Sequence, residues 1–272
     1  MIGKKQKEKN LSVYLREHGR EKRKKRLLRN FIFIILAILF LADGVGYLVF
    51  RTRIFRNLDI QVVGNKEVSV EDVLNVARAQ IFDDNYFKYL LGFNNILAWP
   101  DELKEVNRMI PKIESIKVEK SYFKKRVVLK VSERQNYGVW CMEQGGEKCF
   151  AFDDKGIIFS RGTPSEGSLI HNIRDYSSRM IGILSVVLPE DEFINLKEIF
   201  EVVELAGMNY KFLEIKDLSL KEIKTSGGSG PTVYFSLRFS PKFALTAIQE
   251  IGQGISKLQY LDFRVENKVY YK

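Results

Sequence analysis

The stretch FIFIILAILFLADGVGYLVF, residues 31–50, decides the architecture of this chain. It contains one charge, Asp43, and as a helix it is about 30 Å long, the thickness of a bilayer's hydrocarbon core. The apolar core of a cleaved signal peptide is shorter, about 7–15 residues, and leads to a small-x-small cleavage site. Here the stretch ends in Tyr-Leu-Val-Phe and Arg51 follows. We therefore predict an uncleaved transmembrane helix over residues 31–50, with the lipid bilayer as a partner.

Positive charge is concentrated on the N-terminal side of this helix. The chain has 272 residues and a formal net charge of +10, but residues 1–30 alone carry 12 Lys and Arg against 3 Glu. The nearly neutral remainder does not indicate a nucleic-acid-binding domain, and we expect no nucleic-acid partner, although DNA binding by the tail is the open alternative. Eight basic residues lie in 11–30 and four in 51–70, so the positive-inside rule predicts a cytoplasmic tail over 1–30 and an extracytoplasmic bulk.

Asp43 is the exceptional residue of the span, because a carboxylate inside a bilayer is costly and usually faces a partner or water. Ala42 and Gly46 are four residues apart and form a small-xxx-small face beside it. This pattern predicts contact with another membrane helix. The alternatives are that Asp43 reaches the outer interface or is protonated.

Residues 54–133 show a βααββ order of patterns, typical of a small α+β domain. Ser69 and Asp72 form a capping pair before an apolar stripe at helical spacing, and Pro100 with two acids is typical of a helix start. Between these helices, the segment Gln80–Trp99 is rich in aromatic residues and its function stays open. The expected elements are a strand at 54–63, helices from Ser69 and from Pro100 to Pro111, and strands at Ile113–Lys120 and Val127–Glu133.

Residues 134–272 are predicted to form a second, mixed α/β domain with an antiparallel sheet. Its strands alternate apolar and polar residues, and its helices have apolar stripes at helical spacing. The expected elements are a hairpin of Tyr137–Cys141 and Cys149–Phe152 around Gly145-Gly146, a strand at Gly156–Ser160, a helix at Pro189–Gly207, strands at Phe212–Leu220 and Thr232–Phe239, a helix at Phe243–Ser256, and strands at Leu258–Val265 and Lys268–Tyr271.

The chain has two cysteines, Cys141 and Cys149, both in the predicted outer part. They lie across the hairpin, where paired strands bring Cα atoms to about 4.5–5.5 Å, so we predict a disulfide. Two free thiols in a compartment without oxidant is the alternative. Two cysteines lack the further ligands of a closed zinc site, and we expect no metal.

His171 is the one histidine outside the tail, so the chain invites comparison with a sortase-like extracytoplasmic cysteine transpeptidase. In those enzymes the histidine precedes the cysteine, whereas His171 follows both cysteines here. The sequence contains no His-Glu-x-x-His or Gly-x-Ser-x-Gly motif. We therefore expect no enzyme activity, no catalytic residue, no cofactor and no small-molecule substrate.

Several motifs occur in an order that resembles the FtsQ/DivIB family of bacterial cell-division proteins. They are a basic tail, a single span, Ile60–Asn65, Asn95–Leu97, Ile116–Lys120, Val127–Val131, Glu133-Arg134, Trp140, Phe152–Gly156 and Leu261–Arg264. The resemblance implies that residues 54–133 are a POTRA domain that mediates recruitment to the division septum, and that residues 134–272 are a partner-binding β domain. It also implies that the last strands bind division proteins of the FtsB/FtsL type.

The C-terminal strand is the expected binding site, because a chain end is often a sheet edge that can pair with an incoming strand. Val269, Tyr270 and Tyr271 would supply interface anchors, and Lys268 would limit indiscriminate pairing. The resemblance adds Arg264 and Val265 to this site. Two alternatives stay open: the two tyrosines cap the core, or the chain is a POTRA-type chaperone that binds polypeptides.

Overall fold

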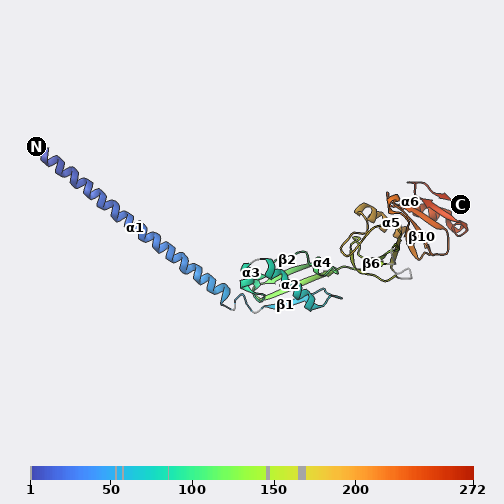
Figure 1. Cartoon of the computed structure of the whole chain (residues 1–272), viewed down its shortest axis with the longest axis horizontal. Helices are drawn as coiled ribbons and strands as arrows, with labels where there is room; N and C mark the ends of the chain where they lie inside the picture. Colours follow the sequence, from blue (N-terminus) through green and yellow to red (C-terminus); the bar gives the residue numbers. More distant parts are fainter. Residues whose placement is uncertain (1, 53, 57, 85, 145–147, 165–169) are drawn as a thin grey trace. The chain divides into compact units, whose positions relative to one another are not determined.

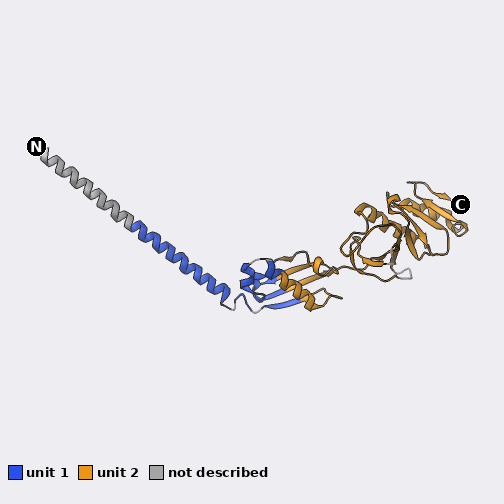
Figure 2. Ribbon diagram, in the orientation of Figure 1, with its two compact units in different colours: residues 1–61, 80–100, 120–127 blue, residues 62–79, 101–119, 128–272 orange. Residues whose placement is uncertain are grey.

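The structure is a computed structural model that describes residues 2–52, 54–56, 58–84, 86–144, 148–164 and 170–272 (Figure 1). The side chains of residues 2–25, Asp84 and Gln253 lie outside this description, as does the turn predicted at Gly145-Gly146. The chain is a mixed α+β protein with one N-terminal apolar helix and antiparallel-rich sheets. It divides into two compact units, shown in Figure 2: Met1–Gln61 with Gln80–Pro100 and Lys120–Val127, and Val62–Ala79 with Asp101–Glu119 and Val128–Lys272.

The first helix, α1 (Ile2–Phe50), continues without a break from the basic tail into the apolar stretch. Among the described residues, only its part Arg26–Phe50 is long and apolar enough to cross a membrane. The most apolar stretch of this part is not buried against the rest of the protein. An apolar helix of 25 residues that touches the rest of the protein only near its C-terminal end fits a lipid environment, because lipid tails bury its side chains without cost to the backbone.

The first sheet contains four strands among the described residues, in the order β1-β4-β3-β2. Its strands are β1 (Asp59–Val63), β2 (Glu102–Leu103), β3 (Ile113–Ser121) and β4 (Arg126–Glu133). The connecting helices are α2 (Val70–Asp84), α3 (Tyr86–Leu91), η1 (Ile96–Ala98) and α4 (Val106–Met109). On β4 the buried and exposed positions alternate, so Val127, Leu129 and Val131 face the core as the sequence pattern predicts.

The helix predicted to begin at Pro100 is wrong at its first turn. Glu102 and Leu103 instead form a short strand that pairs with Lys117 and Ile116 of β3, and the helix runs only over Val106–Met109. The open side of β3 offers Leu103 both backbone partners and a buried position. This tertiary pairing outweighs the local helix-start signal of Pro and acids, since propensity is a weak preference.

The end of β4 is fixed by the carboxylate of Glu133. It accepts backbone N–H groups of Lys66 (2.7 Å), Val68 (3.0 Å) and Glu67 (3.0 Å), which together form the turn after β1. Burial raises the pKa of the Glu133 carboxyl, but these donors and the charge of Lys112 outweigh burial and hold the pKa below its ordinary value. The turn itself requires Gly64, because a Cβ there would lie 2.4 Å from the carbonyl oxygen of Val131.

Arg134 directly follows β4 and connects it with the part of the chain that forms the second sheet. Its guanidinium forms a buried ion pair with Asp153, and its Nε donates to the carbonyl oxygen of Pro111 at 3.2 Å. Asp153 in turn accepts the backbone N–H groups of Lys155 (3.0 Å) and Ile157 (2.8 Å). A buried charge is tolerated only when it is paired and hydrogen-bonded, and all these residues belong to one compact unit.

The second sheet contains nine strands among the described residues, in the order β13-β12-β11-β10-β9-β8-β5-β6-β7. Its first half consists of β5 (Gly138–Met142), β6 (Lys148–Phe152), β7 (Ile158–Arg161) and β8 (His171–Asp175). Its second half consists of β9 (Phe212–Ile215), β10 (Glu222–Ser226), β11 (Thr232–Ser236), β12 (Tyr260–Phe263) and β13 (Tyr270–Tyr271).

Two helices, α5 (Glu190–Leu205) and α6 (Lys242–Ile251), supply apolar side chains to the main core of this sheet. The short helices η2 (Leu218–Leu220) and η3 (Gly252–Lys257) complete the connections. The buried positions of β9 to β12 alternate with half-buried polar and aromatic positions. Because alternate strand residues face opposite sides, the core lies on one face and a charged face lies on the other.

The second sheet differs from the predicted antiparallel sheet in three pairings. Strands β5 and β8, β8 and β9, and β11 and β12 are parallel. Strand β8 reads His-Asn-Ile-Arg-Asp and shows no apolar alternation, so its sequence did not predict a strand. The strand predicted over Phe212–Leu220 ends at Ile215, because Asp217 caps η2 by accepting the N–H of Ser219 at 2.9 Å.

We predict that Glu133→Gln destabilises the full-length protein by about 1–3 kcal/mol at neutral pH, because a neutral amide oxygen accepts the turn's N–H groups more weakly. The folded pKa of Glu133 lies below the unfolded value of 4.5. Its stabilisation is therefore present above the unfolded pKa and lost as pH falls through the folded pKa. Urea unfolding midpoints at pH 7 and at about pH 3 measure this effect.

The control is Glu119→Gln, which changes a carboxylate that is exposed on β3 and paired with Lys130. This variant should leave the midpoint nearly unchanged at both pH values. A Glu133→Gln midpoint that equals the wild-type midpoint at pH 7 would contradict the assigned role of the carboxylate.

Candidate functional site

The last two strands place the predicted partner-binding residues at one edge of the nine-stranded sheet. Strand β12 is parallel to β11, and β13 pairs antiparallel to β12 with Tyr271 opposite Leu261 and Tyr270 opposite Asp262. Within the described residues β13 is the terminal strand of the sheet. Tyr270 and Tyr271 are 52% and 57% exposed, so these tyrosines do not serve as buried caps of the core.

The hydrogen bonds of Lys272 fix the direction of the backbone groups along this edge. Its N–H donates to the carbonyl oxygen of Tyr260 at 3.4 Å, and its own carbonyl accepts the N–H of Gln259 at 2.6 Å. Backbone groups of successive strand residues point to opposite sides in the plane of the sheet. Those of Tyr271 therefore point away from β12, toward the open side of the edge.

The side chains of β13 also divide between two faces. Tyr271 lies opposite Leu261, which is fully buried, whereas Tyr270 lies opposite Asp262 on the charged face. Val269, just before the strand, packs against the main core. Beside it a shallow groove of about 560 Å³ is lined by Phe243, Ala247, Ile251, Lys268 and Val269.

Arg264 is held firmly on the charged face. It donates to Asp262 through Nε (2.9 Å) and Nη2 (2.6 Å) and to Glu222 through Nη1 (2.8 Å), and its guanidinium lies 4.9 Å from the ring centroid of Tyr234. Hydrogen bonds from the side chain of Arg264, then its backbone N–H and its charge, lower the pKa of Asp262 despite burial. Arg264 therefore stabilises β12 against β10 and β11, and its donors are engaged within the chain.

The turn before β13 exposes the two remaining residues of the predicted site. The N–H of Lys268 donates to the carbonyl oxygen of Val265 at 3.1 Å, and Asn267 adopts a positive φ of 55°. Val265 and Lys268 are both exposed. The structure thus brings together all six predicted edge residues, while Glu222 and Tyr234, which hold Arg264, were not predicted. Glu222 and Tyr234 alternate with buried apolar residues along β10 and β11. This alternation in the sequence could have placed both residues on the same face as Arg264.

The predicted transmembrane contact residues lie on the uncovered part of α1. Ala42 and Asp43 are exposed, and Gly46 is partly exposed with no atom within 4 Å of a Cβ built on it. This small-residue face is therefore accessible along the apolar helix.

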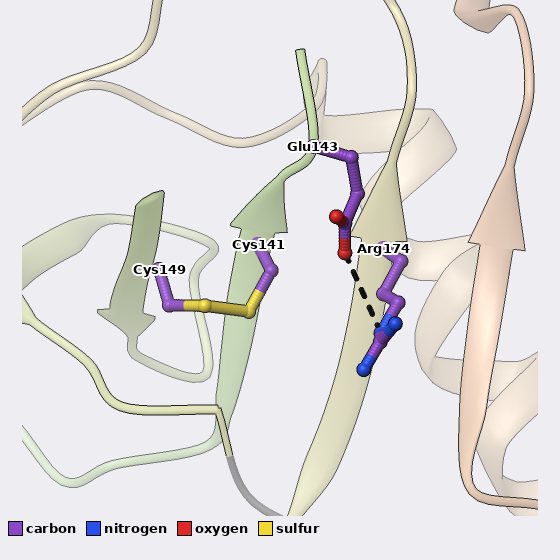
Figure 3. The surroundings of a disulfide bond; sticks show 4 residues. All are labelled: Cys141, Glu143, Cys149 and Arg174. Atoms are coloured by element: carbon purple, nitrogen blue, oxygen red, sulfur yellow. Dashed lines mark ion pairs between the residues drawn. A yellow bond between two sulfur atoms is a disulfide. The ribbon is translucent and has the colours of Figure 1, made fainter. Parts of the chain in front are cut away.

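Cys141 and Cys149 are joined by a disulfide and lie directly opposite each other on β5 and β6, with Cα atoms 4.0 Å apart. Figure 3 shows the bond between the neighbouring strands, beside an ion pair of Glu143 and Arg174 at 3.5 Å. Trp140 and Met142 face the main core, so Cys141 between them faces the other side of the sheet.

His171 lies on the opposite face of the sheet from this disulfide. Its ring stacks on Phe200 of α5 with centroids 4.0 Å apart and also contacts Tyr137 at 4.7 Å. Burial among these rings lowers the pKa of His171, although the charge of Glu204 opposes this effect. The histidine and the cysteines are therefore not arranged as a nucleophile and its base, which need hydrogen-bonding distance.

The described residues contain no group of three or more His, Cys, Asp and Glu side chains that could hold a metal ion. Comparison of the sequence with protein-family models and with curated proteins found no match.

We predict that the double variant Cys141→Ala, Cys149→Ala unfolds at lower urea concentration, with a loss of about 2–3 kcal/mol, because the bond restrains a short loop in the unfolded chain. Reduction of the wild-type protein should lower the midpoint by a similar amount. Labelling of the native protein by a thiol reagent without reductant, together with an unchanged midpoint, would contradict this prediction.

Proposed function

We propose that this chain is a non-enzymatic, membrane-anchored scaffold of the cell-division machinery that binds other division proteins outside the cytoplasm. The observation that carries the proposal is the open edge of β13, where Tyr270 and Tyr271 are exposed beside outward-facing backbone groups. The proposed partners are division proteins of the FtsB/FtsL type, and no nucleic acid or small molecule is required.

Membrane anchoring is supported by the uncovered apolar helix Arg26–Phe50. The excess of basic residues before this helix favours a cytoplasmic N-terminus and an extracytoplasmic bulk, in the inner (plasma) membrane at the division septum. The exposed face of Ala42, Asp43 and Gly46 is suited to contact with the membrane helix of a division partner. A neighbouring helix would also give the Asp43 carboxyl a polar partner.

The proposed binding mechanism is the addition of a strand to β13. An incoming strand would pair with the outward N–H and C=O groups of Tyr271, and its side chains would meet the exposed tyrosines. The hydrogen bonds of Arg264 hold β12 in place, so binding costs little conformational entropy at this edge. Lys268 flanks the edge with positive charge, which disfavours pairing with unrelated strands.

A POTRA identity for residues 54–133 is the second part of the proposal. The order of a strand, helices and a final pair of strands supports it, with β3 and β4 as that pair. The additional strand β2 and helix α3 are insertions into the expected βααββ order. In this proposal the domain mediates recruitment to the septum.

The lack of catalytic activity is part of the proposal, and it is supported by the positions of His171 and of the two cysteines. The disulfide occupies both sulfur atoms, and His171 packs on the other face of the sheet. This arrangement disfavours the sortase-like transpeptidase, whose thiolate has to be activated by a base within hydrogen-bonding reach.

We predict that Tyr271→Pro weakens capture of the FtsB/FtsL-type partner about tenfold more than Tyr271→Ala does. Both variants lose the tyrosine ring, but only proline also removes the outward N–H that an added strand requires. Full-length wild-type and variant proteins are purified from their own membranes, and the co-purified division proteins are quantified.

Deletion of Lys268–Lys272 should abolish capture while the remaining protein stays folded and keeps its native disulfide. The matched control is Arg161→Ala on β7, the strand at the other edge of the sheet, which should capture the partner normally. Equal capture by Tyr271→Pro, Tyr271→Ala and wild type would rule out strand addition at β13. Enrichment of many unrelated polypeptides would instead favour the chaperone alternative.

A further inference from the structure

A second group of exposed apolar side chains lies on segments that adjoin the end of α1. Tyr86 is 76% exposed and Phe123 is fully exposed, and the same segments also expose Phe87, Tyr89, Leu90 and Tyr122. These six residues, here called the juxtamembrane surface, come from α3 and from the turn between β3 and β4. Large exposed apolar groups of this kind mark contact sites for a membrane or a protein.

The core does not need these side chains, because a different set from the same segments fills it. Leu91, Ile96 and Trp99 are buried, and the indole N–H of Trp99 is satisfied by the carbonyl oxygen of Phe93 at 3.0 Å. The segment therefore has an inward set that stabilises the fold and an outward set whose side chains are half or more exposed.

Direct contacts bind the α3–η1 segment to the last turns of the apolar helix. The Asn95 side chain donates to the carbonyl oxygen of Val49 at 3.2 Å, and the rings of Phe50 and Phe87 meet edge to face with centroids 5.8 Å apart. The exposed aromatic residues of α3 are thus attached to the C-terminal end of the apolar helix.

Hydrogen bonds connect the turn between β3 and β4 to the residue that follows η1 and to the start of β1. The ammonium group of Lys120 donates to the carbonyl oxygen of Trp99 at 3.0 Å, and the carbonyl oxygen of Lys125 accepts the N–H of Asp59 at 2.9 Å. Figure 2 shows that the C-terminal half of α1, the α3–η1 segment and this turn belong to one compact unit.

We propose that the juxtamembrane surface inserts into the outer headgroup region of the bilayer that α1 spans. The inference rests on the membrane anchoring proposed above, and its occupant is lipid because the surface continues directly from the end of a lipid-exposed helix. Tyrosine rings suit this region, since one end is apolar and the other is polar. Exposed Arg51 and Lys124 lie in the same unit and would face anionic lipid phosphates.

The test places single tryptophans in the full-length protein, which is reconstituted in vesicles of phosphatidylcholine and phosphatidylglycerol. The lipids carry bromine at shallow or deep acyl positions, and bromine quenches nearby tryptophan emission. Tyr89→Trp and Phe123→Trp report on the juxtamembrane surface, Leu39→Trp on α1, and Met180→Trp on a fully exposed apolar position of the other compact unit. The native Trp99 and Trp140 are buried, and their signal is subtracted using the unsubstituted protein.

We expect shallow bromines to quench Tyr89→Trp and Phe123→Trp more strongly than deep bromines do, and more strongly than they quench Met180→Trp. Leu39→Trp should show the reverse order of depth. If Leu39→Trp is quenched while the two surface variants match Met180→Trp, the surface proposal is wrong and anchoring stands. If Leu39→Trp is not quenched, anchoring and the surface both fail. A blue-shifted but unquenched emission at Phe123→Trp would overturn the proposal by showing that protein covers the surface.

Discussion

The strands at the two edges of an open sheet have outward N–H and C=O groups that no strand of the same sheet pairs with. These groups can form hydrogen bonds with a further strand. Chains commonly hide these edges, but β13 exposes two tyrosines beside its outward groups. The binding role proposed for the chain depends on this constraint. A two-residue strand offers few hydrogen bonds of its own, so the exposed rings and the turn residues beside it are needed to make an interface of useful affinity.

The adjacent side chains of Glu133 and Arg134 carry opposite charges, and each holds a different segment of the chain against the end of β4. Glu133 gathers the N–H groups of the turn after β1, and Arg134 pairs with the buried Asp153, which itself orders the chain that leads to β7. Both side chains are buried and hydrogen-bonded, and removal of Asp153 would leave the buried charge of Arg134 without its counter-charge. The motif that helped to indicate a family resemblance therefore has a structural explanation independent of that resemblance.

The sequence predicted elements well where one local pattern dominated. The helix expected at Pro189–Gly207 is found at Glu190–Leu205, and the hairpin that carries Cys141 and Cys149 has the expected register. Strand β8 and the short strand β2 could not be predicted, because both take their conformation from neighbouring strands instead of from their own residue pattern. The edge residues were predicted from their position at the chain end, whereas the Arg264 network depends on β10 and β11, which only the folded sheet brings together.

The topology explains why β13 lies at the edge of the sheet. Strands β11 and β12 are parallel, so the chain between them has to cross over the sheet, and α6 makes that crossing. After β12 the chain turns at Asn267 and returns as β13 on the outer side, since β11 already occupies the inner side of β12. The ion pairs of Arg264 then fix β12 from the charged face while Leu261 and Phe263 fix it from the core. An edge that is rigid and yet open is suited to strand addition, because its shape is set before any partner arrives.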